Sequence, residues 1–146
     1  QADIVCTASD DCKAAVWDCS RCTQVRALAQ HGREVLGVRC LGASPAYDRS
    51  VVTASADRHL RVWDLRAPSL QCALPAPGRQ RLVLAVCAPS HLAACGCDDG
   101  SVVAWDLRTL RPLHRLDLSS RPGFGKEVTG LAFSPCCSRL AASSCS

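Results

Sequence analysis

Three Trp-Asp pairs recur at nearly even spacing along this chain, and this repeat is the feature that most limits how the chain can fold. The pairs are Trp17-Asp18, Trp63-Asp64 and Trp105-Asp106, at intervals of 46 and 42 residues. An aspartate stands six residues before each tryptophan, at Asp11, Asp57 and Asp99. Repetition with a period of about 40 residues indicates similar structural units that bury their apolar faces against one another.

Short segments rich in Val, Leu, Ala and Thr fill the intervals between these pairs, and Gly, Pro, Ser or Asp separate them. Such segments predict short β-strands joined by turns, and no window has a sustained helical period. The middle unit is predicted to contain the strands Val35–Leu41, Val51–Ser55, His59–Asp64 and Leu70–Leu74. The next unit repeats this pattern as Leu82–Cys87, His91–Gly96, Val102–Asp106 and Pro112–Leu116. A last unit begins at Val128–Phe133 and continues from Leu140, so the predicted fold class is all-β.

Four short strands per period, closing on Trp-Asp, resemble the WD40 repeat family, whose repeats form the blades of a β-propeller. The resemblance implies four-stranded antiparallel blades. It divides the chain into part of a blade (1–30), two complete blades (31–74 and 75–116) and the start of a further blade (117–146). Because a propeller has roughly four to eight blades, we expect this chain to be an internal fragment of a longer protein.

In that family a hydrogen-bonded tetrad ties each blade together, and the resemblance assigns residues of this chain to it. The complete set is His31, Ser55, Asp57 and Trp63, in which Ser and Asp would serve as partners for the buried indole and imidazole. Partial sets are Ser9, Asp11 and Trp17 in the first unit, and Asp99 and Trp105 in the third. Cys97 takes the Ser position in the third unit. All these residues are therefore expected to be structural.

The sequence carries no signature of an enzyme. Ser55, His31 and Asp57 have the residue types of a hydrolytic triad, but the tetrad already uses them and no Gly-x-Ser-x-Gly turn presents a nucleophile. No phosphate-binding loop is present either, since Pro-Gly-Phe-Gly-Lys at 122–126 lacks the required pattern. We expect a non-enzymatic protein that has no catalytic residues, cofactor or small-molecule substrate.

Charge and hydropathy narrow the range of partners. The net charge is +4, and the basic residues are scattered rather than clustered, so nucleic acid is not an expected ligand. No segment reaches the length of about 18 apolar residues that a membrane span requires, so no membrane insertion is expected. Other proteins are the expected partners.

The chain contains twelve cysteines, and so many could indicate a metal site or disulfides, but their spacing argues against both. Cys19 and Cys22 form a single C-x-x-C without a second pair at the distance typical of zinc sites. Several other cysteines occupy predicted strand positions that suit a small buried thiol: Cys6, Cys40, Cys72, Cys87 and Cys145. We therefore expect no metal, unpaired thiols and a reduced intracellular setting, cytoplasmic or nuclear.

Trp-Asp-Leu-Arg occurs twice and places Arg66 and Arg108 at the same point of consecutive units. Paired boxes of this kind resemble those of WD40 substrate receptors for cullin-4 ubiquitin ligases, where they would dock on a ligase adaptor. A plainer interpretation is that each arginine pairs with a neighbouring acid.

The function we expect is a protein-binding scaffold or adaptor, with a ligase substrate receptor as the alternative. An activity elsewhere in a larger protein is a third possibility.

Overall fold

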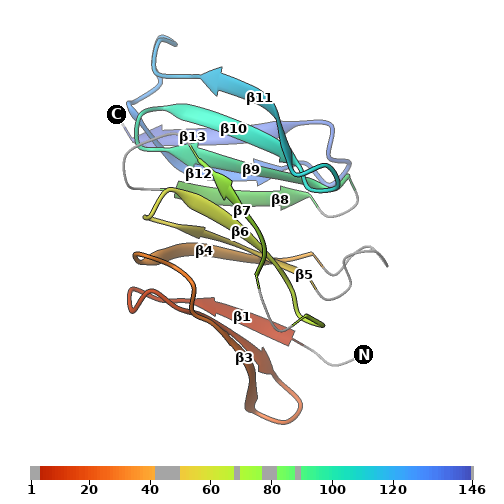
Figure 1. Ribbon diagram of the computed structural model, residues 1–146. Coiled ribbons are helices and arrows are strands. Elements are labelled where there is room, and N and C mark those ends of the chain that lie inside the picture. Colours follow the sequence, from red (N-terminus) through yellow and green to blue (C-terminus); the bar gives the residue numbers. More distant parts are fainter. Residues whose placement is uncertain (1–3, 42–49, 68–69, 77–81, 88–89, 146) are drawn as a thin grey trace.

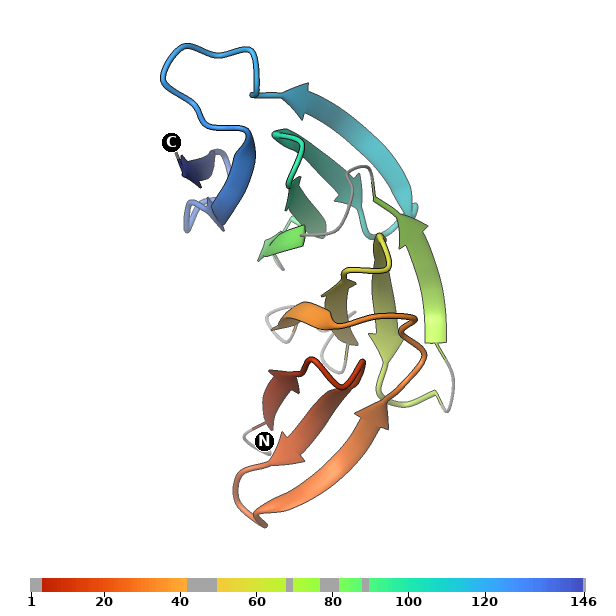
Figure 2. The same cartoon turned by 90° about the vertical axis from the view of Figure 1, so that its left-hand side faces the viewer.

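The computed structural model describes residues 4–41, 50–67, 70–76, 82–87 and 90–145, with the backbone alone at 82, 83 and 87. Every element in these ranges is a β-strand, and the strands form four separate antiparallel sheets in chain order (Figure 1). The all-β prediction is confirmed. Viewed at right angles to Figure 1, the sheets stand side by side along an open arc (Figure 2). The described ranges contain no helix that could cross a membrane.

The sheets differ in their number of strands. The first contains β1 (Ile4–Ala8), β2 (Ala14–Asp18) and β3 (Thr23–Leu28). The second contains β4 (Val35–Cys40), β5 (Ser50–Ser55), β6 (His59–Asp64) and β7 (Leu70–Pro75). The third contains β8 (Leu82–Cys87), β9 (Leu92–Cys97), β10 (Ser101–Asp106) and β11 (Arg111–Asp117). The fourth contains β12 (Glu127–Phe133) and β13 (Leu140–Cys145). Within each sheet, every strand pairs with the strands next to it in sequence.

The recurring aspartate has the same structural task in the first three sheets. It ends the turn between two strands by accepting a hydrogen bond from the backbone N–H two residues later, as Asp57 does from His59 at 3.1 Å. The same bond joins Asp11 to Lys13 and Asp99 to Ser101. The residue after each aspartate has a positive φ: Cys12, Arg58 and Gly100. The turn chemistry thus explains why aspartate repeats at this position.

Each Trp-Asp pair coincides with an irregularity in its strand. The pairing with the next strand shifts register immediately before the tryptophan, between Val16 and Trp17, Val62 and Trp63, and Ala104 and Trp105. Bulges increase the local twist of a strand. The repeat is therefore visible in the backbone as well as in the side chains.

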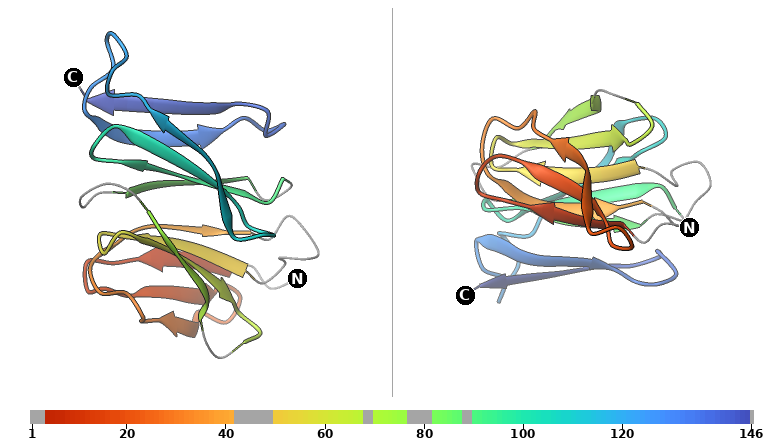
Figure 3. Two further views of the ribbon diagram at one scale, coloured as in Figure 1. Left: turned by 45° about the horizontal axis from the view of Figure 1, so that its top comes forward. Right: turned by 90° about the horizontal axis from the view of Figure 1, so that it is seen from below.

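The sheets stack face to face (Figure 3). Apolar residues between neighbouring sheets form the core, and a tryptophan belongs to each of two such layers. Trp63 packs with Ala14, Val16 and Leu28 of the first sheet, and is 2% exposed. Trp105, 1% exposed, belongs to the layer that contains Val52 and Leu60 of the second sheet. Trp17 lies on the outer face of the first sheet and is 36% exposed. The same dipeptide therefore contributes very different amounts of buried area in the three units.

The cysteines only partly follow the prediction of buried thiols. Cys95 and Cys97 are buried and Cys6 and Cys72 half-buried, but Cys40 and Cys145 are exposed although they lie in strands. Cys137 is placed in a disulfide, so the expectation of unpaired thiols is wrong at that residue. The Cys87 side chain lies outside the described part. Within the described ranges, no three His, Cys, Asp or Glu side chains gather as a metal site would require.

Candidate functional site

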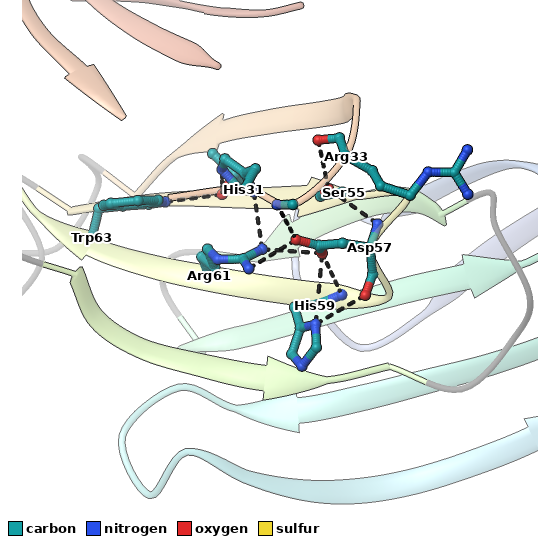
Figure 4. Close-up of polar contacts among 9 residues, drawn as sticks. His31, Arg33, Ser55, Asp57, His59, Arg61 and Trp63 are labelled. Atoms are coloured by element: carbon teal, nitrogen blue, oxygen red, sulfur yellow. Dashed lines mark hydrogen bonds and ion pairs between the residues drawn. The ribbon is translucent and has the colours of Figure 1, made fainter. Parts of the chain in front are cut away.

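A buried chain of hydrogen bonds links two side chains of the second sheet to His31, which precedes that sheet, and it begins at the indole of Trp63 (Figure 4). Trp63 Nε1 donates to Thr53 Oγ1 at 2.9 Å, and Thr53 Oγ1 lies 3.1 Å from His31 Nε2. The His31 and Trp63 rings are tilted against each other with centroids 5.6 Å apart. Strand β5 positions the hydroxyl, β6 positions the indole, and the segment before β4 brings in the imidazole.

The other imidazole nitrogen fixes the tautomer of His31. His31 Nδ1 lies 3.0 Å from an Arg61 guanidinium nitrogen, and a guanidinium can only donate. Nδ1 must therefore accept this hydrogen bond, which leaves the proton of a neutral imidazole on Nε2. Nε2–H then donates to Thr53 Oγ1, so the hydroxyl oxygen accepts from both rings.

Asp57 completes the cluster by pairing with Arg61. The guanidinium bonds both carboxylate oxygens, at 2.8 and 3.1 Å, and the two side chains are only 13% and 10% exposed. The same carboxylate accepts the backbone N–H groups of Gly32 at 2.8 Å and His59 at 3.1 Å. A buried ion pair is stable only when further hydrogen bonds of this kind compensate for the loss of water.

The role predicted for Ser55 was wrong. Its hydroxyl donates to the Arg33 carbonyl at 3.1 Å and accepts the Asp57 N–H at 3.2 Å, and the indole instead bonds Thr53. Residues 53 and 55 lie on the same face of β5 because side chains alternate along a strand. The register decides between them, since Trp63 pairs with Val51 and residue 55 pairs with His59 at the far end. His31, Asp57 and Trp63 do meet in one cluster.

The surroundings shift two pKa values in this cluster. Burial lowers the pKa of His31 most, and the positive charge of Arg61 lowers it further. The negative charge of Asp57 raises it by less, so the pKa is about 4. Burial by itself raises the pKa of Asp57, but hydrogen bonds from Arg61, Gly32 and His59 outweigh it and hold that pKa at about 2. At neutral pH the cluster therefore contains a neutral imidazole, a carboxylate and a guanidinium. The Thr53 hydroxyl is fully buried and accepts from two rings, so this cluster is suited to holding strands together.

The first and third units contain parts of the same arrangement. Trp17 Nε1 donates to Thr7 Oγ1 at 3.0 Å, ten residues earlier, just as Trp63 donates to Thr53. Ser9 accepts the N–H of Asp11, as Ser55 does from Asp57. In the third unit the position ten residues before Trp105 is Cys95, and both residues are buried. Among the described residues, the complete polar network lies in the second unit, and in the third unit Trp105 is buried in an apolar layer.

Replacing Thr53 with valine is expected to lower the free energy of unfolding by about 2 kcal/mol, because the substitution leaves the Trp63 and His31 N–H groups buried without an acceptor. Thr7→Val is the matched control. It removes the same indole bond where Trp17 is 36% exposed, so water can replace the lost acceptor and the loss should be below about 1 kcal/mol. Urea denaturation measures both free energies of unfolding. Equal losses for the two variants would contradict the idea that the Thr53 bond matters more because it is buried.

Acid is expected to destabilise the protein through His31. Its folded pKa of about 4 lies below the ordinary value of 6.5, so between these values only the unfolded chain binds the proton. Stability should therefore fall as the pH is lowered from 6.5, by about 2 kcal/mol at pH 5. Urea denaturation across this range should show a flatter pH dependence for His31→Gln. A wild-type slope retained in His31→Gln would assign the effect to other groups.

Arginine-aspartate pairs form a second arrangement, in the turns that follow β2, β6 and β10. Asp64 accepts the backbone N–H of Arg66 at 2.9 Å and holds its guanidinium with both oxygens, at 3.0 and 3.1 Å. Asp106 binds Arg108 in the same way, with the guanidinium contacts at 3.4 and 3.5 Å. In the first unit Arg21 Nε lies 3.9 Å from Asp18, one residue further along the turn.

The arginine side chains in these turns are exposed, by 82% at Arg21, 56% at Arg66 and 64% at Arg108. Hydrogen bonds from Arg66 lower the pKa of Asp64, and the bond from the Arg66 side chain has a larger effect than the bond from its backbone N–H. The pKa of Asp106 is also lowered, mainly by the hydrogen bond from the backbone N–H of Arg108. Each arginine thus pairs with the aspartate of its own Trp-Asp motif. We call these three pairs of an exposed arginine with a less exposed aspartate, Asp18–Arg21, Asp64–Arg66 and Asp106–Arg108, the arginine rim.

Comparison with known proteins agrees with the repeat and the sheets. The family model described as "WD domain, G-beta repeat" matches residues 22–64, which include the second Trp-Asp pair. The chain belongs to the WD40-repeat family. Its sheets are WD40 blades arranged along part of a propeller, as predicted. Repeats of this family generally mediate interactions between proteins.

Several curated proteins are similar to this WD40 chain over about two thirds of its length or more. WD repeat-containing protein 37 of Homo sapiens is 33% identical over 106 residues, which is 72% of this chain and 21% of that protein. Small ribosomal subunit protein RACK1y of Oryza sativa subsp. japonica is 31% identical over 99 residues, 67% of this chain and 28% of that protein. Myosin heavy chain kinase C of Dictyostelium discoideum is 26% identical over 113 residues, 77% of this chain and 14% of that protein. The chain therefore spans less than a third of each relative.

Proposed function

We propose that this WD40 chain is part of a non-enzymatic scaffold or adaptor, and that the arginine rim is one of its docking surfaces for other proteins. The observation that carries the proposal is the repetition, at the same turn of three consecutive blades, of an exposed arginine paired with the aspartate of the Trp-Asp motif. The buried polar residues of the second blade bond one another, whereas the rim presents its guanidinium groups to solvent. We further propose a cytoplasmic or nuclear setting.

The pairing prepares these arginines for binding. An aspartate that holds the guanidinium in one orientation reduces the side-chain freedom lost when a partner docks. Arginine is also weakly hydrated for a charged group and is enriched at the energetic centres of protein interfaces. Blades of similar geometry set the spacing between successive pairs, so the rim suits a rigid partner surface that contacts two or three turns at once.

Affinity purification of the full-length protein followed by mass spectrometry tests this role. The variant is Arg66→Ala combined with Arg108→Ala. The matched control is Arg115→Ala, because that side chain is equally exposed, at 63%, but lies on β11 away from the rim. We expect partners that the wild type and the control retain and the double variant loses. The same set of partners in all three samples would overturn the docking role of the rim.

A substrate receptor of a cullin-4 ubiquitin ligase is the second candidate. It is favoured by the two successive Trp-Asp-Leu-Arg segments whose arginines are held in the same bidentate manner. In the same purification, this candidate requires the ligase adaptor among the partners that the double variant loses. Absence of the adaptor from the wild-type sample would exclude the receptor role and leave the scaffold proposal standing.

A further inference from the structure

Two cysteines of different blades meet where the first sheet packs on the second. Cys6 lies in the middle of β1 and Cys40 ends β4, and their sulfur atoms are 2.9 Å apart. Cys6 is half-buried and Cys40 is exposed, so solvent reaches the pair. We propose that Cys6 and Cys40 are an oxidation site, at which a peroxide joins the two blades through a disulfide.

The geometry requires little movement. A disulfide has a sulfur–sulfur distance of about 2.05 Å, so the two atoms need to approach by roughly 0.9 Å. Cys95 and Cys97 also interact through their side chains, but they lie on one strand and both are buried. A bond between those two would connect no separate elements and would lie beyond the reach of an oxidant in solution.

The two thiols are suited to different steps. The hydrogen bond from Cys6 lowers the pKa of Cys40 to about 7, whereas the same bond and burial raise the pKa of Cys6. The exposed Cys40 is therefore the thiolate that reacts first, since the thiolate is the nucleophilic form of cysteine. Cys6 can complete the reaction because its sulfur already lies 2.9 Å from the Cys40 sulfur.

The reaction balances with hydrogen peroxide as the oxidant. The Cys40 thiolate attacks one peroxide oxygen, the O–O bond breaks, and the product is a sulfenic acid and hydroxide, which takes up a proton to become water. The Cys6 thiol then loses its proton as its sulfur attacks the Cys40 sulfur, and the S–O bond breaks to release a second water. Two thiols lose two electrons in total, and one peroxide is reduced to two waters.

A bridge at this place would reinforce the joint between the first two blades. The joint already contains the Trp63 layer, a hydrogen bond from the Val35 N–H to the Ser9 carbonyl at 3.1 Å, and bonds from Arg26 to the Asp64 and Ala67 carbonyls. Cys6 and Cys40 are 34 residues apart, and closing a loop of that length restricts the unfolded chain. Oxidation should therefore raise the Tm of the protein.

Peptide mapping of the full-length protein tests the site. Reduced protein is treated with hydrogen peroxide, the remaining thiols are alkylated, and unreduced tryptic peptides are identified by mass spectrometry. We expect the peptide that ends at Lys13 to be linked to residues 40–49. Because the first peptide also contains Cys12, the link must persist in Cys12→Ser and vanish in Cys6→Ser and Cys40→Ser.

Cys136 is the internal control for the oxidant. It is exposed, and hydrogen bonds from Ser134 and Ser138 lower its pKa to about 7, so peroxide should oxidise it in every variant. The peroxide dose is raised until Cys136 reacts. Fully alkylated Cys6 and Cys40 at that dose would overturn the proposal, as would a link that survives in Cys6→Ser. A Tm that rises on oxidation of the wild type but not of Cys40→Ser would confirm that the bridge joins the blades.

Discussion

Replacing Asp57 with alanine is expected to lower the free energy of unfolding by about 3–5 kcal/mol, because it removes one partner of a buried ion pair. The guanidinium of Arg61 is 10% exposed and would keep its charge without a carboxylate. The backbone N–H groups of Gly32 and His59 would lose their acceptor as well. Urea denaturation of the variant and the wild type measures the difference.

Asp11→Ala is the matched control for this prediction. Asp11 occupies the same turn position in the first blade, but it is exposed, and its carboxylate accepts the backbone N–H of Lys13 at 3.1 Å. Removal of this single exposed bond should cost about 1 kcal/mol. Equal losses for the two variants would mean that the aspartate acts only through the turn, and that the buried pair with Arg61 adds nothing.

Gly96→Ala is expected to cost about 3 kcal/mol, because it would force the third and fourth blades apart. A Cβ atom at this position would lie 2.3 Å from Val128 Cγ1 and 2.7 Å from Val128 Cβ, and Val128 is buried. Gly32→Ala is the control, since a Cβ there would make only ordinary contact with Asp57 at 3.5 Å. It should leave stability nearly unchanged.

A double-mutant cycle identifies the cause of the Gly96→Ala effect. Val128→Gly removes the two nearest atoms that the new methyl group would meet and leaves Leu131 Cδ1 at 3.2 Å. It should therefore relieve most of the clash, although it also leaves a gap of its own. We expect Gly96→Ala combined with Val128→Gly to lose at least about 1 kcal/mol less than the sum of the two single variants. Additive losses would show that the alanine does not act through Val128.

The sequence predicted the strands well because turn chemistry and alternation are local. His59–Asp64 and Leu82–Cys87 have the predicted bounds. The strand predicted from His91 begins at Leu92, since His91 has a positive φ and belongs to the preceding turn. The repeat of aspartate and tryptophan was sufficient to predict the family, because the aspartate shapes a turn and the tryptophan fills a layer between sheets.

The polar network was predicted less completely. Thr53 was missed in favour of Ser55, since both hydroxyls lie on one face and only the register separates them. Arg61 was missed because arginine is usually exposed. A signal for it was present, since His59, Arg61 and Trp63 alternate along one strand and Trp63 faces the core. The contact between Cys6 and Cys40 depends on how two sheets pack, and no local pattern indicates it.

We distinguish residues that hold the fold, centred on Asp57, from the arginines of the rim, which we propose bind partners. The most direct measurement of this separation is the urea unfolding midpoint of Arg66→Ala combined with Arg108→Ala. The guanidinium groups of these two ion pairs are exposed to solvent, so the pairs should contribute little to stability. Asp64 and Asp106 still accept the backbone N–H groups of their turns in this variant. The predicted result is a midpoint equal to that of the wild type. A loss as large as that of Asp57→Ala would contradict this distinction, because the rim arginines would then be part of the structural framework.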